Sequence, residues 1–172
     1  MTPQERIDIL RVLEDGRREF NAAAAVSESQ ATASPAPGRW SVLEIVEHVG
    51  TVEDRFLGWL QRSETMETPR VDPQREADLA VRVRYRTNRA EAPEVVRPAD
   101  RFTSLAESLE YFNAARARTI RFADERASDL YSLAADHPRF GALNGIELMV
   151  LMAGHALRHA DQIREARAAV GA

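Results

Sequence analysis

The most informative segment of the chain reads Leu148-Met149-Val150-Leu151-Met152-Ala153-Gly154-His155-Ala156-Leu157-Arg158-His159-Ala160-Asp161-Gln162-Ile163. Its apolar residues recur at helical spacing, and its charged residues gather on the other side of the helical wheel. His155 and His159 stand four residues apart within the apolar face, so their side chains lie one above the other, about 5–6 Å apart at Cβ. The segment therefore predicts a bundle helix that carries two histidines on its inner face.

Helix start signals precede this segment and three others. In a capping box, a Ser, Thr, Asp or Asn at the N-cap is followed three residues later by Glu or Gln. The chain offers this pattern at Thr2 with Glu5, Ser41 with Glu44, Ser104 with Glu107, and Asn144 with Glu147. Four long helices with few strand signals predict an all-α fold, a four-helix bundle with one long crossover connection.

Three regions interrupt the helical pattern. Segment 64–100 contains four prolines, so we expect a long irregular connection between the second and third helices, in which residues 74–88 form a short helix or a strand-like piece. The first helix is expected to fade out at residues 27–30, and residues 31–39 and 127–143 are predicted as loops. The whole chain, 1–172, is predicted to be a single domain.

Composition narrows the chemistry that the chain can support. It has no cysteine, so a metal site would use nitrogen and oxygen ligands, which suit zinc, nickel, iron or manganese. The net charge of −4 gives no reason to expect nucleic-acid binding. No run approaches the roughly 20 apolar residues of a membrane span. The N-terminus lacks the features of a signal peptide, so a cytoplasmic location is expected.

A third histidine, His48, lies at the edge of the apolar stripe of the second helix. Two histidines on one helix and one on another could meet a single ion, and three protein ligands leave a position open for water or substrate, as in catalytic zinc sites. Spacing alone also allows the alternative that all three are satisfied core or surface residues. His48 by itself remains compatible with a surface position.

Other polar residues are weaker candidates. Glu44, one turn before His48, is a candidate general base, although its capping of Ser41 explains it without chemistry. Gln162 could orient a ligand, although a surface position is the simpler interpretation. His137, in a loop before proline, could line the mouth of the site but is not predicted to be a ligand.

Two stretches resemble the DinB-like superfamily, particularly its YfiT-type and DinB_2-type members. They are Trp40-Ser41-Val42-Leu43-Glu44-Ile45-Val46-Glu47-His48-Val49, and His137-Pro138-Arg139-Phe140-Gly141 followed by His155, His159 and Gln162-Ile163. The resemblance spans most of the chain from Trp40 onward. It implies an up-down-down-up four-helix bundle with a divalent metal, commonly zinc or nickel, on His48, His155 and His159. It also implies a homodimer.

The leading functional hypothesis is a metal-dependent enzyme acting on a small-molecule substrate. The ion would activate water for hydrolysis, or a low-molecular-weight thiol such as bacillithiol or mycothiol for transfer. Thiol transfer needs cationic groups for the thiol's carboxylates, for which a basic segment offers Arg82, Arg84, Arg86 and Arg89. The simpler interpretation of that segment is a solvated face balanced by acids. The alternatives are a non-catalytic metal-binding or stress-response module, and a plain helical bundle with structural histidines.

Overall fold

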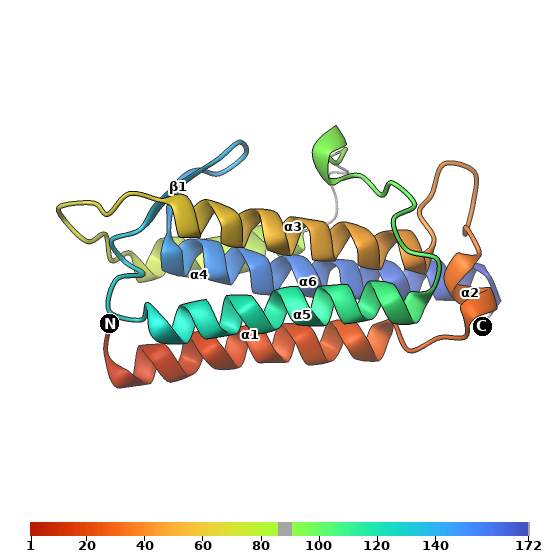
Figure 1. Ribbon diagram of the computed structural model, residues 1–172, viewed down its shortest axis with the longest axis horizontal. Coiled ribbons are helices and arrows are strands. Elements are labelled where there is room, and N and C mark those ends of the chain that lie inside the picture. The colour runs from red at the N-terminus through yellow and green to blue at the C-terminus, as the bar shows by residue number, and fades with distance from the viewer. Residues whose placement is uncertain (86–90, 172) are drawn as a thin grey trace.

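Four long helices share a common axis in the computed structural model, which describes residues 1–85 and 91–171 (Figure 1). They are α1 (Pro3–Ala23), α3 (Val42–Arg62), α5 (Leu105–Glu125) and α6 (Gly145–Ala169). The ribbon colours show that α1 and α6 run in one direction and that α3 and α5 run in the other. Both α1 and α3 pack against α5 and α6, so α1 and α3 occupy opposite corners. The predicted up-down-down-up four-helix bundle is confirmed.

The predicted start signals cap all four of these helices. Reciprocal capping boxes form at Thr2, Ser41 and Asn144, each with the glutamate three residues later. At Ser104 only half of the prediction is correct. The Ser104 hydroxyl accepts a hydrogen bond from the Glu107 backbone N–H, but the Glu107 carboxylate bonds to Thr103 instead.

A short helix and a β-hairpin were not predicted. Helix α2 (Glu28–Thr32) has its own capping box at Ser27, where the sequence predicted only a fading helix end and the start of a loop. Strands β1 (Ala134–His137) and β2 (Gly141–Asn144) pair as an antiparallel hairpin in a segment predicted as loop. A helix of five residues is too short to show a period. The two strands, Ala-Ala-Asp-His and Gly-Ala-Leu-Asn, lack alternation of apolar and polar residues.

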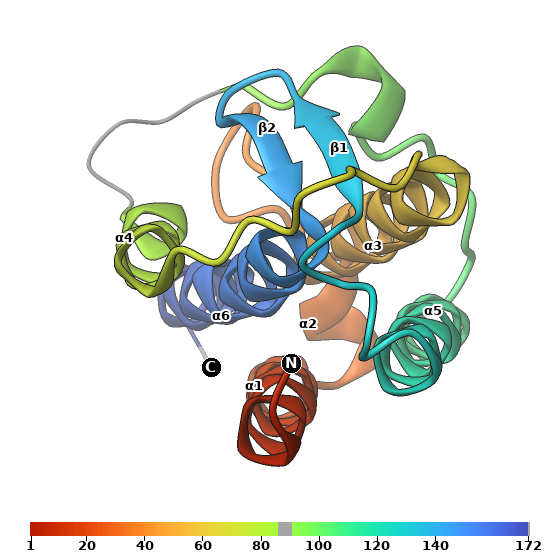
Figure 2. The ribbon, with the colours of Figure 1, turned by 90° about the vertical axis from the view of Figure 1, so that its left-hand side faces the viewer.

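The connection between α3 and α5 is long because α3 ends at the opposite end of the bundle from the start of α5 (Figure 1). It contains α4 (Pro73–Arg84) and the 3-10 helix η1 (Glu94–Val96). Of the two possibilities left open for residues 74–88, the helix is correct, with Asp72 as N-cap and Pro73 in the first turn. Residues 86–88 lie outside the described part. Helix α4 packs along α6, outside the bundle of four (Figure 2).

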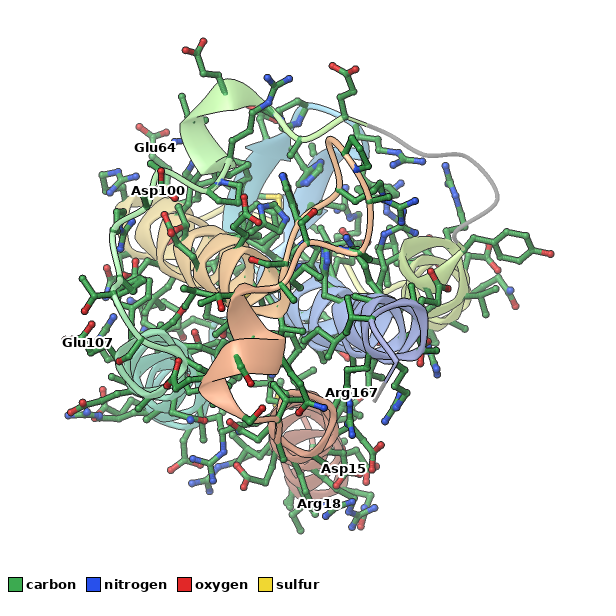
Figure 3. All side chains as sticks on the ribbon, turned by 90° about the vertical axis from the view of Figure 1, so that its right-hand side faces the viewer. Asp15, Arg18, Glu64, Asp100, Glu107 and Arg167 are labelled. Atoms are coloured by element: carbon green, nitrogen blue, oxygen red, sulfur yellow. The ribbon has the colours of Figure 1, made fainter. Side chains whose placement is uncertain are left out.

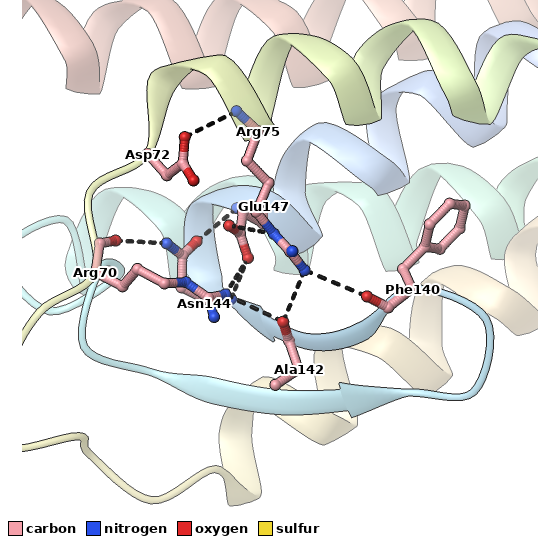
Figure 4. Close-up of polar contacts among 7 residues, drawn as sticks. All are labelled: Arg70, Asp72, Arg75, Phe140, Ala142, Asn144 and Glu147. Atoms are coloured by element: carbon pink, nitrogen blue, oxygen red, sulfur yellow. Dashed lines mark hydrogen bonds and ion pairs between the residues drawn. The ribbon is translucent and has the colours of Figure 1, made fainter.

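A cluster of charges around the buried Glu147 anchors this connection to the start of α6 (Figure 4). Glu147, whose side chain is fully buried, forms ion pairs with Arg70 and with Nε of Arg75, the latter at 2.9 Å. Both arginines also donate to the backbone carbonyl of Ala142 in β2, at 3.1 Å and 3.0 Å. The side-chain amide of Asn144 donates to the Arg70 carbonyl at 2.7 Å. The start of α4 and the hairpin are therefore fixed to the same end of α6.

A second buried ion pair joins the four long helices. The guanidinium of Arg116 on α5 pairs with both carboxylate oxygens of Glu53 on α3, at 2.6 Å and 2.9 Å. It also donates to the backbone carbonyls of Leu13 on α1 and Met152 on α6, at 2.7 Å and 3.1 Å. The core contains two apolar clusters, one that includes Leu13 and Leu148 and another that includes Phe20 and Ile45. No described helix is long and apolar enough to cross a membrane.

Candidate metal centre

The structure brings the three predicted histidines together. His48 of α3 meets His155 and His159 of α6, and one ligand nitrogen from each lies within 4.8 Å of the others. The Nε2 atoms of His155 and His159 are 3.1 Å apart, and the His48 ring lies 5.3 Å and 4.9 Å from theirs, centre to centre. The helical i,i+4 spacing therefore places both imidazoles of α6 against the same point on α3.

His48 lies deeper than its place on the helical wheel suggested. Its side chain is 5% exposed, so the surface position that the sequence left open is wrong. Two segments cover it, because the tilted Trp40 ring lies 4.9 Å from the His48 ring, centre to centre, and Val96 of η1 lies against Nδ1 of His48. Both segments lie outside the long helices. A helical wheel drawn for α3 alone does not include them, and it therefore places His48 at the edge of the apolar stripe.

The contact with Val96 fixes the tautomer of His48. Nδ1 of His48 lies 2.6 Å from the Val96 carbonyl oxygen, which can only accept, so Nδ1 carries the proton and donates it. Nε2 then keeps its lone pair. Metal-binding histidines are oriented in this way by hydrogen bonds from the second ring nitrogen to a carbonyl or carboxylate.

Burial keeps His48 and His155 neutral. Desolvation lowers the pKa of His48 below its ordinary value of 6.5, and the bond to Val96 only partly offsets this. The pKa of His155 lies well below 6.5, because of burial first and then of repulsion from His159 and His48. A neutral imidazole has a lone pair to offer, so these two side chains are in the metal-binding form at neutral pH.

The donor set and its spacing fit a divalent metal ion. Neutral imidazole suits zinc, nickel, copper and iron. Nitrogens bound tetrahedrally at about 2.0–2.1 Å lie roughly 3.3 Å from each other. The 3.1 Å between the Nε2 atoms of His155 and His159 is close to that separation. With three ligands from the protein, a four-coordinate ion would keep one position for water or substrate.

Glu44 is engaged in the helix cap that the sequence also predicted for it. Its carboxylate accepts from the Ser41 backbone N–H and hydroxyl, at 2.7 Å and 2.8 Å. It is not among the residues that meet at the cluster. These contacts account for Glu44 as a capping residue, and its role as a general base stays a prediction.

His137 lies away from the three-histidine cluster. Its ring packs on α3 against Phe56 and Trp59, at 5.3 Å and 5.9 Å between ring centres. Phe56 follows His48 by eight residues, about 12 Å along a helix. Nδ1 of His137 accepts from the backbone N–H groups of Arg139 and Phe140, at 3.1 Å and 3.3 Å, so this histidine shapes the tip of the hairpin.

The described arginines of the basic segment, Arg82 and Arg84, are exposed. Arg84 lies 3.6 Å from Asp161, and the Arg82 guanidinium lies over the Phe140 ring, 5.6 Å from its centre. Arg86 and Arg89 lie outside the described residues. The pairing of Arg84 agrees with a solvated face balanced by acids, and binding of a thiol's carboxylates stays a prediction.

The residue that sequence reasoning missed is Glu47, beside His48. Its carboxylate is 2% exposed and accepts from the backbone N–H groups of Ala99 and Arg101, at 2.8 Å and 3.3 Å. An acidic residue in the middle of an amphipathic helix usually faces solvent, so its type gave no signal. Only its place on the wheel next to the apolar stripe could have hinted that it is buried.

Comparisons with known proteins agree with this picture. The family model of the DinB superfamily matches residues 13–163. No curated protein matches the chain. Among solved structures, the chain is similar to YfiT from Bacillus subtilis, with a TM-score of 0.61 and 16% sequence identity over 99% of this chain and 90% of that one. YfiT is described as a probable metal-dependent hydrolase with an unusual four-helix bundle topology. At that identity, the likeness shows a shared fold.

Proposed function

This chain belongs to the DinB superfamily, and we propose that it is a metal-dependent enzyme of the hydrolase type, with a divalent ion on His48, His155 and His159. The observation that carries the proposal is the convergence of three imidazole nitrogens from two helices within 4.8 Å. The description of YfiT as a probable metal-dependent hydrolase supports the same reaction class. Zinc and nickel are the first candidates for the ion, and iron and manganese follow.

Three protein ligands argue for a catalytic rather than a structural site. Structural zinc sites are closed by four protein ligands, whereas catalytic sites keep a place for water or substrate. When bound, the ion supplies Lewis acidity and lowers the pKa of its water toward about 7.

The chain's own residues prepare the site. Val96 fixes the His48 tautomer, and burial keeps His48 and His155 unprotonated. The Trp40 ring shields one side of His48 from solvent.

A low-molecular-weight thiol as co-substrate stays a second proposal for the same site. A divalent ion can bind a thiolate as readily as water, so the three histidines serve either reaction. The two reactions differ in what else they need, since transfer requires a binding site for the thiol's carboxylates. A substrate panel with and without added thiol separates them.

The first experiment is metal analysis of protein purified without an affinity tag. We expect near one equivalent of a divalent metal in the wild type and none in His155→Ala/His159→Ala. His137→Ala is the matched control, because His137 lies outside the cluster, and it should keep the metal. The metallated wild type is then tested on esters, amides and thiol acceptors.

Three outcomes would count against the proposal. No uptake of zinc or nickel by the wild type, even after loading, would overturn the metal site and favour a bundle with structural histidines. Metal binding without turnover of any substrate would favour the non-catalytic module. Full activity in a metal-free His155→Ala variant would overturn the proposed role of the ion.

A further inference from the structure

A strap of backbone, residues 91–101, runs over α3 (Figure 1) and contacts it. It contains η1, whose Val96 carbonyl accepts the hydrogen bond from His48. Farther along the strap, Ala99 and Arg101 donate their backbone N–H groups to the two carboxylate oxygens of Glu47. Consecutive residues of α3, Glu47 and His48, therefore hold the same strap at two points.

The Glu47 contact holds the strap in a conformation that its sequence disfavours. Asp100, between the two N–H donors, has a φ of 54°, in the left-handed region that residues other than glycine rarely adopt. This turn makes the N–H groups on either side converge on one anion, as in backbone nests. In Figure 3, Asp100 lies beside α3 on the outside of the bundle, and its side chain is exposed. The buried carboxylate is thus the group that stabilises the turn.

We infer that Glu47 is a positioning residue for the metal centre. By fixing the strap at residues 99–101, it holds the Val96 carbonyl where it accepts the proton of His48 Nδ1 and directs Nε2 to the cluster. The part of this inference that concerns metal affinity rests on the proposed function. The part that concerns the tautomer of His48 does not, because it refers to the protein without metal.

A merely structural role for Glu47 is the competing explanation. The Val96 side chain is itself buried, and Arg101 also donates to the Thr51 hydroxyl at 3.2 Å, so the strap has other attachments to α3. If those attachments suffice, the loss of Glu47 will loosen residues 99–101 without reaching His48. The experiment must therefore read out His48 as well as stability.

Glu47→Gln is the variant of choice, because it keeps the side-chain shape but removes the charge and one of the two acceptor oxygens. The matched control is Glu28→Gln. Glu28 also accepts a backbone N–H with its carboxylate, from Leu105 at 3.1 Å, four residues beyond the end of the strap. Zinc affinity is measured by calorimetry with the metal alone. The ring-nitrogen shifts of His48 are measured by ¹⁵N NMR in metal-free protein.

We expect Glu47→Gln to weaken zinc binding by about 10–100-fold, the usual effect of removing an outer-shell partner. In the metal-free variant, His48 should change from a single Nδ1–H tautomer to a mixture. Glu28→Gln should match the wild type in both measurements. Wild-type zinc affinity together with an unchanged His48 tautomer in Glu47→Gln would overturn the inference.

If Glu47→Gln does not fold, a second variant still tests the inference. Asp100→Pro forbids the positive φ, because proline fixes φ near −65°. It alters an exposed residue and leaves the core intact. It should give the same two losses, and wild-type behaviour in it would contradict the inference. If the wild type binds no zinc, the proposed function fails, while the tautomer of His48 in these variants still decides the role of Glu47.

Discussion

Val83 of α4 lies directly on Gly154 of α6, so closely that a Cβ atom built on Gly154 would come 2.1 Å from Val83 Cγ1. Val83 is buried by this contact, and Gly154 immediately precedes His155. The absence of a side chain at residue 154 therefore allows α4 to pack beside the candidate metal centre.

Gly154→Ala should destabilise the protein by about 1–3 kcal/mol, the usual effect of overpacking a core, although alanine favours a helix more than glycine does. Val83→Ala in the same chain should restore part of the loss. Gly58→Ala is the matched control, since its Cβ would meet only the flexible end of Arg62. It should stabilise the fold by up to about 1 kcal/mol. Urea unfolding measures all three variants, and equal effects at the two glycines would contradict this explanation.

Arg116→Met should cost about 3–5 kcal/mol of folding stability, because it leaves the buried Glu53 carboxylate without its partner. The double variant Glu53→Leu/Arg116→Met should be more stable than Arg116→Met alone. Arg118→Met is the control on the same two helices. Arg118 pairs with Asp54 at the surface, where ion pairs are worth about 0–1 kcal/mol. A double variant no better than the single one, in chemical denaturation, would argue against an uncompensated charge as the cause.

Zinc should stabilise the wild type and leave His48→Ala unchanged. A ligand at about 100 times its Kd adds about 2.7 kcal/mol to the free energy of unfolding. For a chain of this size, that raises the Tm by roughly 5–10 °C. Differential scanning fluorimetry with zinc, then with a chelator, measures the shift. His137→Ala should shift like the wild type. A shift of the same size in His48→Ala would place the ion elsewhere.

The metal-free protein should lose stability as the pH falls below about 6.5. His48 and His155 have pKa values lowered in the folded state, so below 6.5 the unfolded state binds more protons. Each histidine contributes a slope of at most about 1.4 kcal/mol per pH unit until its folded pKa is reached, and nothing well above 6.5. Unfolding in the presence of a chelator, at pH values from 8 to 5, tests this. His155→Gln should show the shallower slope, and identical slopes would remove His155 as a cause.

The sequence predicted the helices well because helix signals are local. A capping residue and its partner are three positions apart, and an apolar face repeats every turn, so Thr2, Ser41, Ser104 and Asn144 could be identified as N-caps without knowledge of the fold. The pairing of His155 with His159 is also a local signal, because the two residues are only four positions apart. The likeness to the DinB-like superfamily then implied that His48, already a candidate from its place on the second helix, is the third ligand, and it implied the directions of the helices.

The sequence did not predict the contacts of Arg116 with Glu53 or of His48 with Val96, which join distant segments. Arg116 and Glu53 are 63 residues apart, and His48 and Val96 are 48 apart. Neither pair has a sequence separation that a helix or strand repeat would reveal. The hairpin at residues 134–144 depends likewise on packing, because His137 rests on Phe56 and Trp59 of α3. The sequence left the exposure of His48 open for this reason, since the strap that covers it comes from an irregular segment.

The Arg116–Glu53 pair also sets the lengthwise alignment of the helices. Apolar faces alone tolerate one helix sliding past another by a turn, about 5.4 Å, since the same kinds of side chain recur at each turn. Such a slide would separate the guanidinium from its carboxylate and from the Leu13 and Met152 carbonyls. Glu53 follows His48 by five residues, and Met152 precedes His155 by three. The ion pair thereby keeps the three imidazoles at the same level along the bundle axis.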